Sequence, residues 1–210
     1  MNTIPRNHRS RSEIAIKRSR FITSIARTDS EQQARDFIAE IRAEFPDARH
    51  HCSAYIVPQE DANDILRSSD DGEPSGTAGI PMLDVLKGEN LTRITAVATR
   101  YFGGTLLGAG GLVHAYSHSV SKAIDTIPRL ALSTGHLYHL TVPHTDAGKV
   151  EAGLRSAGWE VTQTTYGKEA TIELACAPDE HEQLFTICAS LTKGARSPEF
   201  QGTFTREVPM

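Results

Sequence analysis

Cysteine is scarce in this chain of 210 residues, which contains three. Cys52, Cys176 and Cys188 lie far apart and form no CxxC pair. Isolated cysteines in an odd number argue against a disulfide framework and against a cysteine-rich zinc site. We therefore expect three buried free thiols in a protein from a reducing compartment.

Long apolar runs and a secretory signal are also missing. No stretch of about 18 apolar residues occurs, and residues 1–20 are polar and basic without an apolar centre. The composition, 39% hydrophobic and 23% charged, is that of a folded chain and not of a disordered, collagen-like or coiled-coil one. These features predict a soluble, cytoplasmic protein that has no membrane partner.

Charge is unevenly distributed along the chain. Residues 1–27 contain seven basic residues and one acidic residue, a net charge of +6. Residues 28–132 contain nine basic and fifteen acidic residues (−6), and residues 133–210 contain six basic and ten acidic residues (−4). The basic N-terminal edge could contact phosphate groups, and residues 1–11 are equally well explained as a mobile, solvated tail. The total of −4 gives no nucleic-acid footprint, and DNA binding is not predicted.

The apolar periodicity predicts an α/β (α+β) protein with two domains, at residues 1–132 and 133–210. Ser30 and Gln33 form a capping box at the start of the first predicted helix, and Pro46 ends it. The other elements expected in the first domain are one or two strands over 12–28, strands at 50–57 and 94–99, a turn at 58–63, and helices at 77–86 and 112–127.

The second predicted domain alternates between strand and helix patterns. The expected elements are a strand at 138–142, a helix at 147–157, a hairpin over 161–176, a helix at 184–191 and a strand at 200–208. The order βαββαβ is that of the ferredoxin-like fold.

The first segment that could carry chemistry is a run of turn residues, 69–79, with three carboxylates at Asp70, Asp71 and Glu73. Hard cations prefer such oxygens, and magnesium fits better than an EF-hand calcium site, whose twelfth-position acid is missing. The favoured interpretation is an acidic surface loop in which Ser75 or Thr77 caps the next helix. The alternative is a magnesium-dependent hydrolase or phosphate-handling enzyme with a nearby histidine as base.

The second segment, 100–112, runs from a predicted strand through a glycine-rich turn into a helix. Glycine lets the backbone approach a ligand closely, and a helix N-terminus attracts anions. The signatures of ATP and NAD sites are both absent from it. Arg100 could bind a phosphate and Tyr101 or Phe102 could stack a base, although strand alternation places Tyr101 on the opposite side. The structural alternative is a buried aromatic pair, a helix packed tightly against the sheet, and Arg100 paired with Asp70 or Asp71.

The histidines predict no metal site. His50 and His51 are adjacent on a strand and point to opposite faces, and no glutamate completes an HExxH motif at His114 and His118. No nucleophile elbow is present. We therefore predict no catalytic residue, no metal and no cofactor.

Three segments, 47–52, 69–79 and 100–112, together resemble the IMPACT/YigZ family in order and spacing. The resemblance covers about the first 130 residues closely, and the rest is similar in layout to the small C-terminal domain of the bacterial branch. It implies a first domain with the ribosomal-protein S-five domain-2-like fold and a ferredoxin-like second domain. This pair of folds resembles two adjacent domains of elongation factor G, and eukaryotic relatives are linked to translational control. The family supplies no catalytic residues to carry over.

The leading hypothesis is a non-enzymatic, translation-associated regulator that binds RNA, the ribosome or a protein partner in a groove between segments 69–79 and 100–112. The charge of −6 around these segments favours a protein partner, or a ribosome contact through the basic N-terminus. The residues expected at the groove are Asp70, Asp71, Gly72, Glu73, Arg100, Tyr101, Gly103, Gly104, Gly108 and Gly110.

Overall fold

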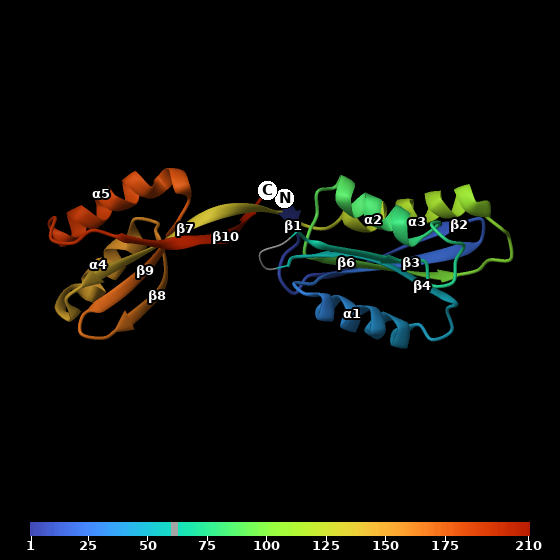
Figure 1. Ribbon diagram of the computed structural model, residues 1–210, viewed down its shortest axis with the longest axis horizontal. Coiled ribbons are helices and arrows are strands. Elements are labelled where there is room, and N and C mark those ends of the chain that lie inside the picture. Colours follow the sequence, from blue (N-terminus) through green and yellow to red (C-terminus); the bar gives the residue numbers. More distant parts are fainter. Residues whose placement is uncertain (60–62) are drawn as a thin grey trace. The chain divides into compact units, whose positions relative to one another are not determined.

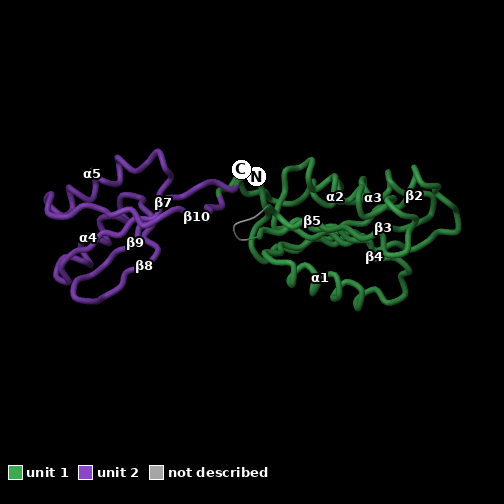
Figure 2. Tube along the Cα trace, viewed as in Figure 1, with its two compact units in different colours: residues 1–131, 208–210 green, residues 132–207 purple. Residues whose placement is uncertain are grey.

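The computed structural model describes residues 1–59 and 63–210, which divide into two units (Figure 2). Unit 1 comprises residues 1–131 and 208–210, and unit 2 comprises residues 132–207. The turn expected at 58–63 includes residues 60–62, which lie outside the described residues. Within the described part of the chain, no helix is long and apolar enough to cross a membrane.

Unit 1 is built on one antiparallel sheet with the strand order β2-β3-β6-β4-β5. Helix α1 (Glu31–Glu44) covers one face of this sheet, and α2 (Gly79–Gly88) and α3 (Gly108–Ile124) cover the other (Figure 1). The strands are β2 (Arg9–Ile16), β3 (Ser19–Arg27), β4 (His50–Val57), β5 (Ile65–Ser69) and β6 (Ile94–Tyr101).

The central strand β6 shows why the sheet has helices on both faces. Its apolar, β-branched run is buried on both sides. Ile94, Ala96 and Ala98 join the core under α2 and α3, whereas Val97 packs under α1 with Phe37. This two-sided burial explains the continuous apolar pattern, since a strand with one solvated face would alternate.

The start of α1 follows the predicted capping chemistry. The Ser30 side chain accepts a hydrogen bond from the backbone N–H of Gln33 at 3.2 Å. The Gln33 side chain in turn accepts from the N–H of Asp29 at 2.7 Å. The Ser30 bond satisfies one donor that the helix leaves unpaired. The reciprocal bond goes to Asp29, one residue before the N-cap, and not to Ser30 as in a regular capping box.

The expectation of a mobile basic tail over residues 1–11 is wrong. Strand β1 (Asn2–Thr3) pairs with Leu130 and Ala131, and β2 begins at Arg9 and pairs with β3 along its whole length. The arginines of β2 lie opposite acidic residues of α1: Arg9 pairs with Glu40 and Arg11 with Glu44. The positive charge of this segment therefore compensates a helix of the same unit. A sequence pattern of basic and small residues does not reveal such partners.

Unit 2 confirms the ferredoxin-like order predicted for it. Its strands are β7 (Leu130–Val142), β8 (Glu160–Tyr166), β9 (Ala170–Cys176) and β10 (Glu199–Pro209), with β9 and β10 pairing with β7 and β8 with β9. Helices α4 (His144–Ser156) and α5 (His181–Thr192) pack on this sheet, and a short 3-10 turn η1 (Pro178–Glu180) precedes α5. Leu140, Leu154 and Ile172 are fully buried in its core.

Candidate functional site

Asp70 organises the loop of residues 69–79, called the 69–79 loop below. One carboxylate oxygen accepts from the N–H groups of Ala78 (3.0 Å) and Gly79 (2.8 Å), and the other accepts from Gly76 (2.8 Å). Burial raises the pKa of Asp70, but these three donors outweigh it, so the pKa lies below its ordinary value. Asp70 thus supplies the cap that α2 lacks at its own N-cap residue.

This arrangement corrects the predicted start of α2. The helix begins at Gly79 instead of residue 77, and neither Ser75 nor Thr77 caps it. The Thr77 hydroxyl donates to the carbonyl of Pro74 at 2.6 Å. A carboxylate nine residues upstream performs the capping, which spacing rules for local caps do not anticipate.

Asp71 fastens the 69–79 loop to the rest of unit 1. Its carboxylate accepts from the backbone N–H of His51 at 2.6 Å and pairs with Arg42 of α1. Its carbonyl lies 2.8 Å from His50 Nδ1. Burial raises the pKa of Asp71, but the His51 N–H and the Arg42 guanidinium together lower it below the ordinary value. The carboxylate is engaged on both oxygens.

Glu73 lies inside unit 1, where it holds Arg100. The two side chains are 4% and 7% exposed, and Arg100 Nη1 lies 2.6 Å from Glu73 Oε1. The Tyr116 hydroxyl donates to the same oxygen at 2.7 Å. The guanidinium sits 5.5 Å from the ring centre of Phe21 and 5.6 Å from that of Phe102. Arg100 therefore forms an ion pair within unit 1, as the structural alternative predicted, but its partner is Glu73 and not Asp70 or Asp71. The aromatic pair expected to be buried beside it is not, since Phe102 is half exposed.

The choice of partner has a physical reason. Asp70 and Asp71 have their carboxylates occupied by loop amides, His51 and Arg42, whereas the buried Glu73 is free to accept from the guanidinium. A buried guanidinium needs a compensating anion, and a paired one has little capacity left for a phosphate.

Cys52 and Tyr116, the reactive groups nearest this pair, are both held in their neutral forms. Burial raises the pKa of Cys52 to about 12, and its thiol donates to the carbonyl of Asp70 at 3.0 Å. Burial, together with Cys52 and Glu73, raises the pKa of Tyr116. Neither group supplies a nucleophile or a base at neutral pH.

A magnesium site finds no free donor set in the 69–79 loop. Each of the three carboxylates already accepts from protein donors. Over residues 1–59 and 63–210, no group of three or more His, Cys, Asp or Glu side chains is arranged to hold a metal ion. His114 and His118 stack on each other along α3, with ring centres 5.7 Å apart.

A cavity of about 400 Å³ lies between the 69–79 loop and the segment 102–112. Its floor includes the Arg100–Glu73 pair, and its rim includes Phe102 (50% exposed) and Leu106 (84% exposed). Large apolar side chains exposed together beside a cavity are typical of binding surfaces. The remaining lining residues are Arg49, His50, Pro74, Leu107, Gly108, Ala109 and Leu112.

The structure brings only part of the expected residue set to this cavity. Glu73, Arg100 and Gly108 line it. The expected residues that do not line it are Asp70, Asp71, Gly72, Tyr101, Gly103, Gly104 and Gly110. Tyr101 stacks under the guanidinium of Arg20 instead.

Gly103 is needed for close packing. A Cβ atom at this position would lie 2.0 Å from the carbonyl carbon of Arg18. Its N–H donates to the Ser19 hydroxyl at 3.2 Å. The backbone approach that glycine permits here is to the protein's own chain.

Sequence reasoning gave too little weight to the apolar lining residues. Leu106 and Leu107 form an apolar pair within a turn-like stretch, and Pro74 lies in the facing loop. Apolar residues between glycines are a signal of an exposed apolar surface, because such a stretch forms no element that would bury them.

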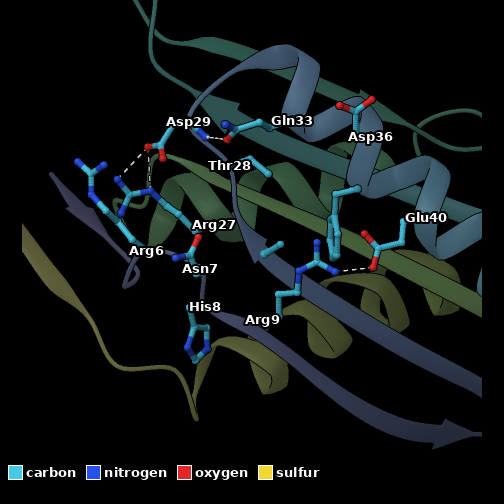
Figure 3. Close-up of a pocket in the computed structure, with 12 residues that line it drawn as sticks. Arg6, Asn7, His8, Arg9, Arg27, Thr28, Asp29, Gln33, Asp36 and Glu40 are labelled. Carbon is cyan, nitrogen blue, oxygen red and sulfur yellow. Dashed lines mark hydrogen bonds and ion pairs between the residues drawn. The ribbon is translucent and has the colours of Figure 1, made fainter.

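A second hollow, of about 480 Å³, lies where β2 and β3 meet α1 (Figure 3). Four of its charged groups form two ion pairs. Arg27 contacts Asp29 at 2.8 Å, and Arg9 pairs with Glu40 across the opening. Burial raises the pKa of Asp29, but hydrogen bonds from Arg93 and Arg27 outweigh it and lower the pKa. Because these charged groups bind one another, we interpret the hollow as the packing boundary between the N-terminal hairpin and α1 and not as a ligand site.

Comparison with known proteins gives consistent matches over both units. The family model described as the Impact N-terminal domain matches residues 17–124, and one described as a domain of unknown function (DUF1949) matches residues 140–194. IMPACT family member YvyE of Bacillus subtilis is 40% identical over 182 residues, which are 87% of this chain and 83% of that protein. IMPACT family member YigZ of Escherichia coli is 38% identical over 180 residues, which are 86% of this chain and 88% of that protein.

A solved structure of similar extent has also been found. It is described as the crystal structure of a hypothetical protein, is 34% identical, and superposes with a TM-score of 0.67. The match covers 96% of this chain and 97% of the other.

Proposed function

Because the chain belongs to the IMPACT family, we propose that it is a non-enzymatic, translation-associated regulator that binds a protein partner in the cavity between the 69–79 loop and segment 102–112. The translation-associated part of the proposal rests on family membership. The binding part rests on one observation, the apolar cavity whose rim exposes Phe102 and Leu106.

A protein partner suits this cavity better than RNA. Arg100, the arginine that the sequence suggested would bind a phosphate there, is buried and paired with Glu73. Phe102 packs against that guanidinium, so one face of its ring is already covered. Protein interfaces use aromatic and aliphatic anchors at their centre with polar groups around them.

The basic N-terminal segment also speaks against a general RNA contact. Arg9, Arg11, Arg20 and Arg27 all form ion pairs inside unit 1. Binding a phosphate backbone would require these pairs to be exchanged, which reduces the gain from counterion release.

An enzymatic role receives little support from the geometry. The three carboxylates of the 69–79 loop are engaged by protein donors, and the nearby Cys52 thiol is buried with a raised pKa. A general acid or base needs a pKa near the working pH and access to substrate.

The proposal is tested by co-sedimentation with bacterial ribosomes isolated at low salt, which retain their associated factors. Wild type is compared with the double variant Phe102→Ser, Leu106→Ser, and with Phe200→Ser as a control, since Phe200 is 54% exposed in unit 2. We expect the double variant to bind at least about tenfold more weakly, because apolar anchors dominate such interfaces. The control should bind like wild type.

Three results would overturn the proposal. The first is absence of wild-type sedimentation with the ribosomes at every salt concentration. The second is equal sedimentation of wild type and the double variant when circular dichroism shows both folded. The third is displacement of wild type by free structured RNA with a steep dependence on salt, which would indicate phosphate contacts.

A further inference from the structure

The cavity described above offers hydrogen-bond donors that nothing in unit 1 satisfies. Arg49 lines it, is exposed, and has no hydrogen bond or ion pair with any residue of the described ranges 1–59 and 63–210. Arg100 also lines it, and its buried Nε has no hydrogen-bond partner within those ranges. The Arg100 side chain is 7% exposed, so this donor is fixed in direction by a packed side chain.

The start of α3 lies at the same cavity and has no side-chain cap. Helix α3 is 17 residues long, its N-cap residue Leu107 makes no side-chain cap, and its first turn has no acidic residue. Gly108 and Ala109 of that first turn line the cavity. The first N–H groups of a helix have no partner within the helix, and they carry partial positive charge.

Acceptors in the cavity are already in use. Glu73 is the carboxylate among its lining residues, and it accepts from both Arg100 and Tyr116. The cavity thus combines unpaired donors, which suit an anion, with the exposed apolar side chains of Phe102 and Leu106, which suit an apolar side chain.

Building on the proposed function, we infer that the occupant of this cavity is the C-terminal residue of a protein partner, an apolar residue with a free carboxylate. A C-terminal leucine carries its carboxylate and its apolar side chain on one Cα atom. A single residue therefore satisfies both halves of a cavity of about 400 Å³. An internal aspartate or glutamate would need a second residue to fill the apolar half.

Backbone donors at helix starts and glycine-rich turns are an established way to bind terminal carboxylates. In this cavity Gly108 has no side chain to obstruct an approaching main chain, and its φ of +74° fits glycine. A polyanion is a poorer occupant, since the surrounding residues 28–132 contain nine basic and fifteen acidic residues.

The test is a titration of ¹⁵N-labelled full-length protein with N-acetyl-leucine and, separately, with N-acetyl-leucinamide, followed by NMR. The two probes differ only in the free carboxylate. We expect the acid to shift the amide signals of Gly108 and Ala109 and to bind at least about tenfold more tightly than the amide, as expected when a charged hydrogen-bonding group is removed.

Variants locate the two halves of the site. Arg49→Gln should weaken binding of the acid severalfold and leave binding of the amide unchanged. Lys149→Gln, which removes an exposed cation of unit 2, is the matched control and should change neither. Leu106→Ser should weaken binding of both probes, because it removes an apolar contact that the acid and the amide share.

The inference is overturned if the acid and the amide bind equally, or if neither shifts these signals. It is also overturned if inorganic phosphate or a short oligouridylate shifts them at lower concentration than the acid, because the site would then select charge alone. Ribosome sedimentation that depends on Phe102 and Leu106, without a preference for the free carboxylate, would defeat this inference and leave the proposed function standing. A preference for the free carboxylate without ribosome binding would defeat the proposed function and leave this inference about the cavity standing.

Discussion

The 69–79 loop and segment 102–112 are both rich in glycine and face each other across one cavity. They differ in how many of their polar groups have hydrogen-bond or ion-pair partners within the protein. In the 69–79 loop the carboxylates of Asp70, Asp71 and Glu73 all have protein partners. Segment 102–112 exposes Phe102 and Leu106, and its helix start is uncapped. The first segment holds unit 1 together and the second offers a surface. Composition alone does not distinguish these two roles, but the hydrogen-bond and ion-pair partners of each segment do.

The largest expected effect on stability comes from removing the Glu73 carboxylate from the 69–79 loop. Glu73→Ala leaves the Arg100 guanidinium buried without its anion, and we expect the free energy of unfolding to fall by about 3–5 kcal/mol. Urea unfolding followed by circular dichroism measures the loss. Glu73→Gln keeps an acceptor for Tyr116 and should lose less. A loss below about 1 kcal/mol for the alanine variant would show that the pair does not organise the loop.

Two glycine substitutions compare a packed position of segment 102–112 with an open one. Gly103→Ala places a Cβ atom 2.0 Å from the backbone of Arg18, and we expect a loss of about 1–3 kcal/mol or more. At Gly110 a Cβ atom would meet nothing within 4 Å, so Gly110→Ala should be neutral or stabilise α3 by up to about 1 kcal/mol. Thermal melting compares them. Similar melting temperatures for the two variants would contradict the division drawn here.

The smallest expected effect is a pH dependence of the free energy of unfolding that arises from Asp70 in the 69–79 loop. The pKa of Asp70 is lower in the folded chain than its ordinary value, so its contribution is present above the unfolded-state pKa of about 3.9. That contribution is lost as the pH falls through the folded-state pKa. Asp70→Asn should cost about 1–2 kcal/mol at pH 7, through weakened acceptance from three N–H groups.

The difference between wild type and Asp70→Asn should therefore shrink at acidic pH, where the wild-type carboxyl is also neutral. Asp47→Asn is the control, since Asp47 is exposed and makes no ion pair within the described ranges. Its unfolding curve should follow wild type at all pH values. A difference for Asp70→Asn that stays constant down to pH 2 would rule out the carboxylate as the source.

The fold was largely predictable because its signals are local. The stripe of Ala147, Val150 and Leu154 in α4 is buried as its helical spacing predicts. The boundary of α3 was not predictable in the same way. The helix begins at Gly108, four residues before the expected start, because glycines in its first turn contribute no apolar stripe.

The candidate site depended on contacts between residues far apart in the sequence. Arg100 was expected to face a ligand, but its partner Glu73 lies 27 positions earlier, on an element whose path the sequence does not specify. For the arginines of β2 the sequence left open a phosphate contact and a solvated tail, whereas their acidic partners lie on α1. Pairing of this kind is decided by tertiary packing, so a local pattern cannot indicate it.

The buried thiol of Cys52 can report how often the 69–79 loop opens. Its sulfur is fully buried and donates to the Asp70 carbonyl, so a thiol reagent reaches it only after the 69–79 loop lifts away from β4. The labelling rate of Cys52 then reports how often that opening occurs. Cys176 and Cys188, buried in unit 2, report openings of that unit in the same sample. One alkylation reaction read by mass spectrometry would time the two units separately in the unaltered chain.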